Sequence, residues 1–246
     1  MLILCQVLLS ALVLPPDTET ARLASIRRAA QDGMCISSVE EQRIAAVGGA
    51  DAWKYGELTP RGFAKLASAV GLDSTDVFLD AGSGLGRLVI QAAREFGTRR
   101  AFGVELARSR HHAALQSLQC EPVNVSCRVT LLEGDCAAQD LWQAHLSSVG
   151  VVFVSNLLFD ASLNQRLKHC IEQHAPQARA VACLRKWSDT LEGYMEPFEV
   201  LCETSWTAPI LLPTDATWST ARGSKVFIYK RIESQISDHT VMHTAR

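Results

Sequence analysis

The sequence predicts an α/β protein with a doubly wound, mostly parallel β-sheet and an antiparallel hairpin at its C-terminal end. Two observations predict this fold class. Short apolar runs alternate with helical stretches from residue 77 to residue 184. Continuous apolar strands of this kind are typical of a parallel sheet covered on both faces. The remaining chain holds two more strand-like stretches with no clear helix between them, as expected for a hairpin.

The chain begins with an uncharged apolar segment, MLILCQVLLSALVL, which ends at Pro15 and Pro16. A membrane span takes about 20 such residues, so this segment is too short to be one. It fits the core of a secretory or organellar signal that lacks the usual preceding basic residues, a packed helix, or a misassigned translation start. We expect three regions along the chain: the apolar segment 1–16, a helical region 17–71 and a sheet domain 72–246.

The region before the sheet is expected to be helical. Helical patterns cover residues 17–32, 37–47 and 59–70. The last pattern has a clear start signal, because Thr59 is a favourable cap and Pro60 suits the first helical position.

Strands and helices are then expected in strict alternation. The five apolar runs predict strands over Val77–Asp80, Ala101–Glu105, Arg128–Glu133, Val151–Ser155 and Ala178–Leu184. Between them, helices are predicted over Leu85–Phe96, 107–118, 138–146 and 161–173. The hairpin strands are predicted over Phe198–Trp206 and Lys225–Ile232.

A glycine-rich bend, DAGSGLGR, joins the first strand to its helix. Glycine is costly there unless the backbone bends sharply or another group comes close to it. The bend follows the first strand, where doubly wound sheets bind their ligands. Its spacing, Asp80 followed by Gly82, Gly84 and Gly86, does not fit the dinucleotide fingerprint G-x-G-x-x-G. The pattern instead suits a ligand without a pyrophosphate, whose ammonium and carboxylate groups lie against bare backbone.

Acidic residues stand at the ends of three successive predicted strands. Asp80 can neutralise an ammonium group, and Glu105 can accept two hydrogen bonds from the vicinal hydroxyls of a ribose. Asp135 is placed to accept a hydrogen bond from an adenine amino group. Together they describe a nucleoside attached to an amino acid. S-adenosylmethionine has this shape and is the expected cofactor.

The composition is that of a globular protein, with 48% hydrophobic and 20% charged residues. The net charge of −2 gives no overall attraction to nucleic acid, so no strong nucleic-acid binding of its own is expected. Basic clusters such as Arg99–Arg100, and Arg108 with Arg110, are interpreted as solvated helix ends and loops. The eight cysteines include no CxxC pair, so no metal site is expected and a reduced, intracellular protein is favoured.

Several segments occur in the order seen in one family. YGELTPRGFAKL, DVFLDAGSGLGRLVIQAA, FGVE, LLEGD, VVFVSNLLFD and ETSWT resemble the disruptor of telomeric silencing 1-like methyltransferases. The likeness covers residues 50–231 and implies the Rossmann-like fold of class I methyltransferases. Members of this family lack a SET domain and use S-adenosylmethionine to methylate a lysine on the globular surface of histone H3 in the nucleosome.

The resemblance implies site residues of two kinds. Those implied to bind the cofactor are Tyr55, Glu57, Thr59, Asp80, Gly82, Gly84, Gly86, Arg87, Glu105, Asp135, Cys136 and Asn156. The residues implied to take part at the substrate channel and in catalysis are Tyr55, Asn156 and Trp206. The family usually has glutamine at the position of Arg87 and an aromatic residue at that of Cys136.

We therefore expect an S-adenosylmethionine-dependent protein-lysine methyltransferase, acting on a core lysine of histone H3. Two alternatives stay open: a class I methyltransferase with another protein or a small molecule as acceptor, and a non-catalytic module that binds the cofactor. The retained acids and Tyr55 argue against the module. The nucleus or the cytoplasm is the expected location, unless the apolar N-terminal segment directs the chain elsewhere, and no membrane span is expected.

Overall fold

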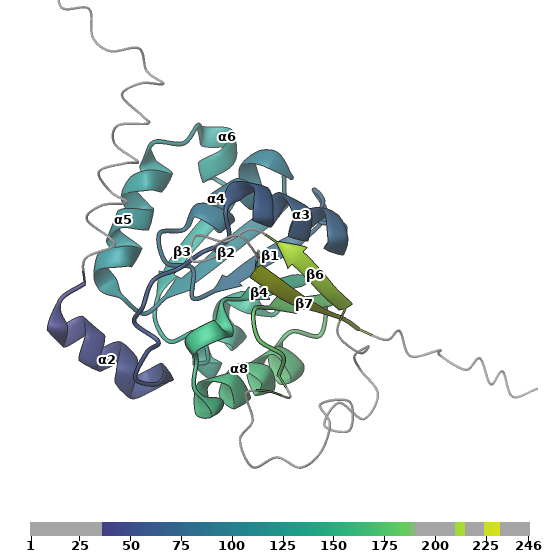
Figure 1. Cartoon of the computed structure of the whole chain (residues 1–246). Helices are drawn as coiled ribbons and strands as arrows, with labels where there is room; N and C mark the ends of the chain where they lie inside the picture. The colour runs from purple at the N-terminus through teal and green to yellow at the C-terminus, as the bar shows by residue number, and fades with distance from the viewer. Residues whose placement is uncertain (1–35, 188, 190–209, 215–223, 232–246) are drawn as a thin grey trace, which may run out of the picture.

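A computed structural model of the chain describes residues 36–187, 189, 210–214 and 224–231. Within them a single seven-stranded sheet is covered by helices on both faces (Figure 1). Four predictions lie outside the described residues: the segment 1–16, the helix 17–32, the strand Phe198–Trp206 and the site residue Trp206.

The seven strands run in the spatial order β3-β2-β1-β4-β5-β7-β6. Their bounds are β1 Val77–Ala81, β2 Arg100–Glu105, β3 Val129–Glu133, β4 Val151–Val154, β5 Ala180–Cys183, β6 Ile210–Thr214 and β7 Ser224–Lys230. The neighbours among β1–β5 pair in parallel, whereas β7 is antiparallel to both β5 and β6. The predicted doubly wound sheet with its antiparallel hairpin is confirmed. The strand order reverses between β1 and β4, so a ligand is expected beyond the carboxyl ends of these two strands.

The helices fill the connections between strands. Their bounds are α2 Ser38–Gly48, α3 Pro60–Val70, α4 Arg87–Glu95, α5 Arg108–Gln119, α6 Val123–Ser126, α7 Gln139–Leu141 and α8 Ala161–His174. Two short helices of other types complete the set: the π-helix η1 Trp142–Leu146 and the 3₁₀-helix η2 Asn156–Leu158. Most predicted elements therefore agree to within two residues at each end. The predicted helix 138–146 is different, because it divides into α7 and η1.

Two apolar layers hold the sheet between its helices. On one face Phe63 of α3 packs edge-on against Phe78 of β1, with ring centroids 5.3 Å apart, and Val89 of α4 is buried beside them. On the other face Trp142 of η1 and Leu167 of α8 are fully buried against the strands. Burial on both faces explains why β1, β4 and β5 are apolar along almost their whole length.

Helix α2 is fixed to two other helices. It begins with a capping box between Ser37 and Glu40. The Glu40 Oε1 also accepts the Ser109 backbone N–H at the start of α5, at 2.8 Å. At the other end of α2, the Gly48 carbonyl accepts the Asp160 backbone N–H at 2.8 Å, directly before α8. These contacts hold α2 beside the carboxyl end of the sheet (Figure 1).

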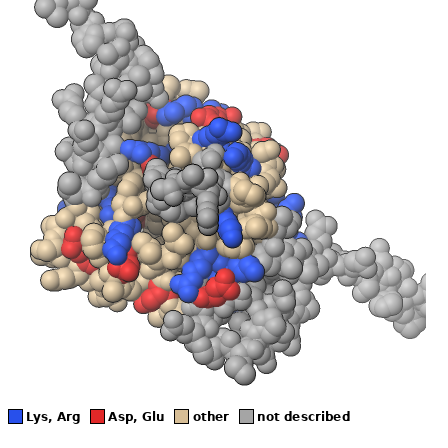
Figure 2. All heavy atoms as spheres, viewed as in Figure 1, with Lys and Arg blue, Asp and Glu red and all other residues tan. Residues whose placement is uncertain are grey.

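The surface of the described residues carries charges of both signs. On the face in Figure 2, Lys and Arg side chains are interspersed with Asp and Glu. Arg99, Arg100 and Arg108 are exposed, as their interpretation as solvated residues requires. None of the helices described is long and apolar enough to cross a bilayer.

Candidate active site

A cavity of about 340 Å³ opens at the carboxyl ends of the strands, where the strand order reverses. Its walls come from α2, the segment 52–56, the glycine bend, the ends of β2 and β3, and the segment 155–159. A smaller pocket adjoins it around Asp80 and shares Tyr55, Gly82 and Ser155 with the cavity. The volume of the larger cavity lies in the range usual for small-molecule sites, about 300–1,000 Å³.

The glycine bend lies beneath this cavity and needs its glycines. Gly82, Gly84 and Gly86 have φ angles of +89°, +52° and +71°, a region that other residues rarely adopt. A Cβ atom on Gly84 would lie 2.7 Å from Tyr55 Cε2, so Tyr55 lies directly against bare backbone. Gly82 and Gly84 line the cavity. Gly86 instead faces Ala114 of α5, and its close approach serves the packing of α5.

Asp80 is the last residue but one of β1, beneath the bend, and is only 3% exposed. Its Oδ1 is buried without a hydrogen-bond partner in the structure. Burial, and then the nearby charges of Glu57 and Glu105, raise the pKa of Asp80 well above its usual value. An unpaired buried carboxylate is unfavourable by itself. A cationic ligand group in the smaller pocket would compensate this charge, so the residue fits the ammonium group of the expected cofactor.

Glu105 at the end of β2 lines the cavity and hydrogen-bonds to the backbone beneath it, which we call the floor of the cavity. Its Oε2 accepts the Gly84 backbone N–H at 2.8 Å, and its Oε1 accepts the Ala107 backbone N–H at 2.7 Å. Burial raises the pKa of Glu105, although these hydrogen bonds and the charge of Arg110 act in the opposite direction. Because each carboxylate oxygen can accept two hydrogen bonds, both oxygens retain capacity for a ribose hydroxyl.

Asp135 and Cys136 follow β3 and line the same cavity. The Asp135 Oδ1 accepts the Ala137 backbone N–H at 2.8 Å, and its Oδ2 lies 2.6 Å from Arg166 Nη1 of α8. Arg166 also donates to the Val47 carbonyl of α2, at 3.1 Å. Cys136 is buried, and burial raises the pKa of its thiol, which therefore stays protonated.

Tyr55, Glu57 and Arg87 form one chain of contacts along the wall. The Tyr55 hydroxyl donates to Glu57 Oε2 at 2.6 Å, and Glu57 Oε1 pairs with Arg87. Burial and the Glu57 charge raise the pKa of Tyr55 far above neutral pH, so this side chain is a neutral phenol. Arg87 lines neither pocket and contacts Glu57, so its predicted role at the cofactor stays a prediction.

Thr59 and Asn156 have structural partners where cofactor contacts were predicted. Thr59 caps α3 by accepting the Gly62 backbone N–H at 3.0 Å, and it lines neither pocket. Asn156 is completely buried and donates to Asn164 Oδ1 and the Arg185 carbonyl. Its Oδ1 accepts the backbone N–H groups of Leu184 and Arg185. Asn156 thus holds the cavity-lining segment around it, and the roles predicted for Thr59 and Asn156 at the ligand stay predictions.

Three contributions to the site were missed by reasoning from the sequence. Arg110 is 5% exposed and lines the cavity, so its interpretation as a solvated residue is wrong. Arg166 and the apolar side of α2, with Ile44 and Val47, were also not foreseen. The sequence did show apolar residues on the helix predicted over residues 37–47. Such a pattern does not indicate which part of the protein the helix covers. The described residues contain no group of three side chains that could hold a metal ion.

Comparison with known proteins gives one family and one fold. The model of the family "Histone methylation protein DOT1" matches residues 48–188. A curated relative from Eremothecium gossypii, "Histone-lysine N-methyltransferase, H3 lysine-79 specific", is 26% identical over 204 residues, which are 77% of this chain and 34% of the relative. A relative of the same description from Kluyveromyces lactis is 29% identical over 130 residues, 48% of this chain and 22% of the relative. This chain thus aligns with about a third of the first relative's length and about a fifth of the second's.

Among solved structures, the methyltransferase domain of bacterial CtHen1-C superposes with a TM-score of 0.51. The superposition covers 71% of this chain and 98% of that domain, at 13% sequence identity. At this identity the likeness concerns the fold, which is the class I methyltransferase fold in both.

Proposed function

Because the chain belongs to the DOT1 family of histone methylation proteins, we propose that it is an S-adenosylmethionine-dependent protein-lysine methyltransferase that acts on a lysine of histone H3. The observation that carries the proposal is the buried Asp80 oxygen with no partner, beneath a glycine bend at the switch point of the sheet. A site of this kind favours a ligand with a positive charge. The cofactor supplies one in its ammonium group and another in its sulfonium.

The remaining contacts of the cofactor follow from the geometry of the cavity. Asp80 and the bare backbone at Gly82 would hold the amino-acid end. Glu105 would accept the ribose hydroxyls, and Asp135 with Cys136 would border the adenine. When bound, S-adenosylmethionine supplies an activated methyl group for transfer to a nucleophile.

The acceptor amine must lose its proton before transfer. A free lysine has a pKa near 10.4 and is almost wholly protonated at neutral pH. Leu157, Leu158 and Phe159 give the cavity an apolar wall, which disfavours an ammonium ion and lowers the pKa of an entering lysine. Tyr55 is a neutral phenol and cannot act as the base. The residues of the site then contribute mainly by aligning the amine with the methyl group.

A second candidate function is methylation of another acceptor by the same site. Leu157 and Leu158 are 40% and 39% exposed beside the cavity, an apolar rim that does not require a histone partner. The net charge of −2 also gives no strong attraction to nucleosomal DNA, for which phosphate contacts supply most of the affinity. If the acceptor is histone H3, the protein acts in the nucleus.

The experiment is incubation of the chain with tritiated S-adenosylmethionine and three separate acceptors: nucleosomes, free core histones and a cell lysate. We expect label on a lysine of histone H3. Label only on other lysate proteins or on metabolites would replace the histone substrate by the second candidate. Absence of label together with absence of cofactor binding would overturn the methyltransferase assignment.

Two glycine variants make this test specific to the site. Gly84→Ala and Gly71→Ala both place a side chain at positive φ, +52° and +62°. Only the Cβ at position 84 meets Tyr55, whereas nothing lies within 4 Å of that at position 71. We expect both variants to lose about 1 kcal/mol or more of stability, but only Gly84→Ala to lose at least tenfold in affinity for the cofactor. Equal affinities in the two variants would contradict the placement of Tyr55 at the ligand.

A further inference from the structure

Arg110 occupies an unusual position for a buried cation. It lies in the first turn of α5, where the helix dipole disfavours positive charge. The favourable negative charge at this end of α5 comes from Glu40 of α2, whose carboxylate accepts the Ser109 backbone N–H. Arg110 is nevertheless buried and lines the cavity, whereas Arg108 in the same turn is exposed. The stability of α5 therefore does not account for the placement of Arg110.

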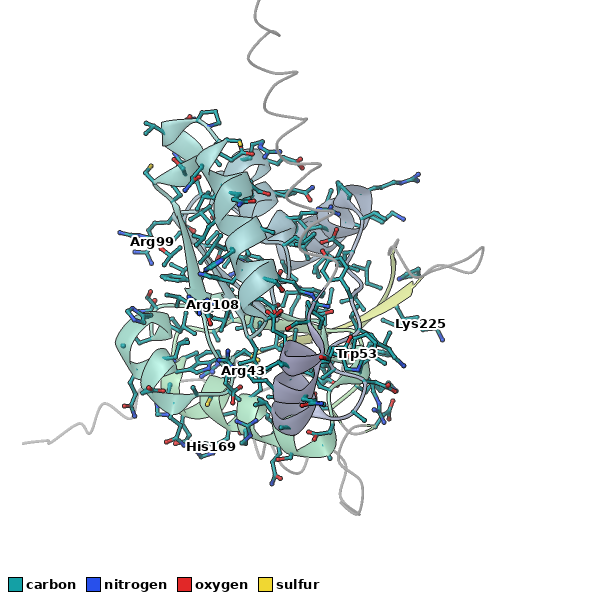
Figure 3. All side chains as sticks on the ribbon, turned by 90° about the vertical axis from the view of Figure 1, so that its left-hand side faces the viewer. Arg43, Trp53, Arg99, Arg108, His169 and Lys225 are labelled. Atoms are coloured by element: carbon teal, nitrogen blue, oxygen red, sulfur yellow. The ribbon has the colours of Figure 1, made fainter. Side chains whose placement is uncertain are left out.

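The contacts of Arg110 are with the segment that walls the cavity between α2 and α3. Its Nη2 donates to the Trp53 carbonyl at 2.5 Å. Its guanidinium carbon lies 5.1 Å from the centre of the Tyr55 ring, within the range of a cation–π interaction. Figure 3 labels Arg108, which lies in the same turn of α5 as Arg110, and Trp53, whose carbonyl accepts the hydrogen bond. We call the two contacts of Arg110, with the Trp53 carbonyl and with the Tyr55 ring, the tether. From Tyr55 a hydrogen bond leads to Glu57, which pairs with Arg87 on α4.

The guanidinium also has a buried donor that no protein group satisfies. The Arg110 Nε is buried and has no hydrogen-bond partner in the structure. Leaving a buried donor unpaired is unfavourable, and Arg110 lines the cavity beside Glu105, the residue proposed to hold the ribose. A ligand oxygen that reached this donor would satisfy it.

We propose that Arg110 is a cofactor-binding and positioning residue: it fixes Trp53 and Tyr55 over the cavity and donates its Nε–H to an oxygen on the ribose side of the bound cofactor. This inference rests on the proposed function, because it takes the ligand to be an adenosyl compound. The only charged side chains that the sequence predicted around the ribose and adenine of this ligand were acidic, and the inference adds a basic residue beside Glu105.

The tether is tested first, without ligand, by hydrogen exchange of the backbone amides in residues 53–57. Arg110→Gln is expected to increase exchange there, and the matched control Arg108→Gln is expected to leave it unchanged. Arg110→Lys keeps a charged donor for the Trp53 carbonyl and should retain most of the protection. Unchanged exchange in Arg110→Gln would overturn the tether.

The contact with the ribose side is tested by calorimetric titration with S-adenosylhomocysteine and with 5′-methylthioadenosine, which lacks the amino-acid end. Arg110→Gln and Arg110→Lys should both lose about tenfold or more in affinity, by a similar factor for the two compounds, since both remove Nε. Arg108→Gln should bind as the wild type does. Wild-type affinity in Arg110→Lys, or a loss confined to S-adenosylhomocysteine, would overturn the contact. A wild type that binds neither compound would overturn the proposed function and this contact, while the exchange result would still decide the tether.

Discussion

Four carboxylates line the cavity or the smaller pocket beside it, and Asp80 differs from the others in its partners. Glu57 pairs with Arg87, Asp135 with Arg166, and Glu105 accepts two backbone N–H groups. Asp80 retains an oxygen without a hydrogen bond, in the centre of the sheet. A residue kept in such a position is typical of a site that gives up stability for ligand binding.

Replacing Asp80 by Asn should therefore separate stability from binding. In the absence of ligand, we expect Asp80→Asn to melt about 2–4 °C or more above the wild type at pH 7.5, a gain of about 1 kcal/mol. The variant should bind S-adenosylhomocysteine at least tenfold more weakly, because the ammonium loses its counter-charge. Thermal denaturation and calorimetric titration measure the two effects. A variant that is less stable and binds normally would contradict the role of Asp80.

The pH dependence of this difference has a definite sign. The pKa of Asp80 is raised in the folded chain above its ordinary value of 3.8. As the pH rises above that value, the unfolded chain ionises first, so the wild type loses stability until the pH passes the raised folded pKa. The advantage of Asp80→Asn should thus grow as the pH rises above 4, until the pH passes the raised pKa of Asp80 in the folded chain. A difference that stays constant over this range would show that Asp80 does not titrate as described.

The acids of the site could be predicted from the sequence, and its arginines could not. Asp80, Glu105 and Asp135 each follow an apolar run, and the ends of parallel strands meet at one edge of a sheet. Arg110 and Arg166 lie on helices, and their partners Trp53 and Asp135 are 57 and 31 residues away in sequence. No local sequence pattern indicates that residues so far apart in the chain will pair.

At the scale of elements, the join between β4 and β5 depends on one side chain. Asn156, in η2 after β4, bonds the backbone of Leu184 and Arg185 directly after β5, and also Asn164 of α8. It therefore fixes the segment 155–159, which lines the cavity. The sequence indicated a polar residue at a strand end, but not that all of its hydrogen bonds would be internal.

We predict that Asn156→Ala destabilises the fold by about 2 kcal/mol or more, because it leaves buried backbone groups without partners. The melting temperature should fall by about 4–8 °C. Gln165→Ala, which removes an exposed amide from α8, is the matched control and should have little effect. If Asn156→Ala melts like the wild type but loses methyl transfer, then Asn156 acts on the substrate as the family resemblance implied.

Elements were predicted best where one physical signal dominates. The buried strands β1, β4 and β5 are apolar throughout, and α3 has both its cap at Thr59 and its stop at Gly71. The edge strand β6 was missed because it contains Pro213, which is tolerated at a sheet edge but weakens a strand signal. The division of residues 139–146 into α7 and η1 has no local sequence signal that we could identify.

At the scale of the whole molecule, the cavity exists only when the sheet, α2 and the segment 52–56 are assembled. A ligand of this cavity therefore binds the folded chain and not the unfolded one. We predict that S-adenosylhomocysteine at about 100 times its dissociation constant stabilises the fold by about 2.7 kcal/mol. The melting temperature should rise by about 5–10 °C.

The control ligand for this shift is NADH, because the glycine bend does not fit the dinucleotide fingerprint. NADH should leave the melting temperature unchanged. A larger shift with NADH than with S-adenosylhomocysteine would contradict the interpretation of the bend and of the proposed cofactor.

Glu105 already restrains the amides of Gly84 and Ala107 before any molecule enters. The floor of the cavity is thus preorganised, and an arriving ligand loses little entropy in shaping it. Adaptation to different ligands must then come from the walls, above all from α2 and the segment 52–56, while the floor stays constant.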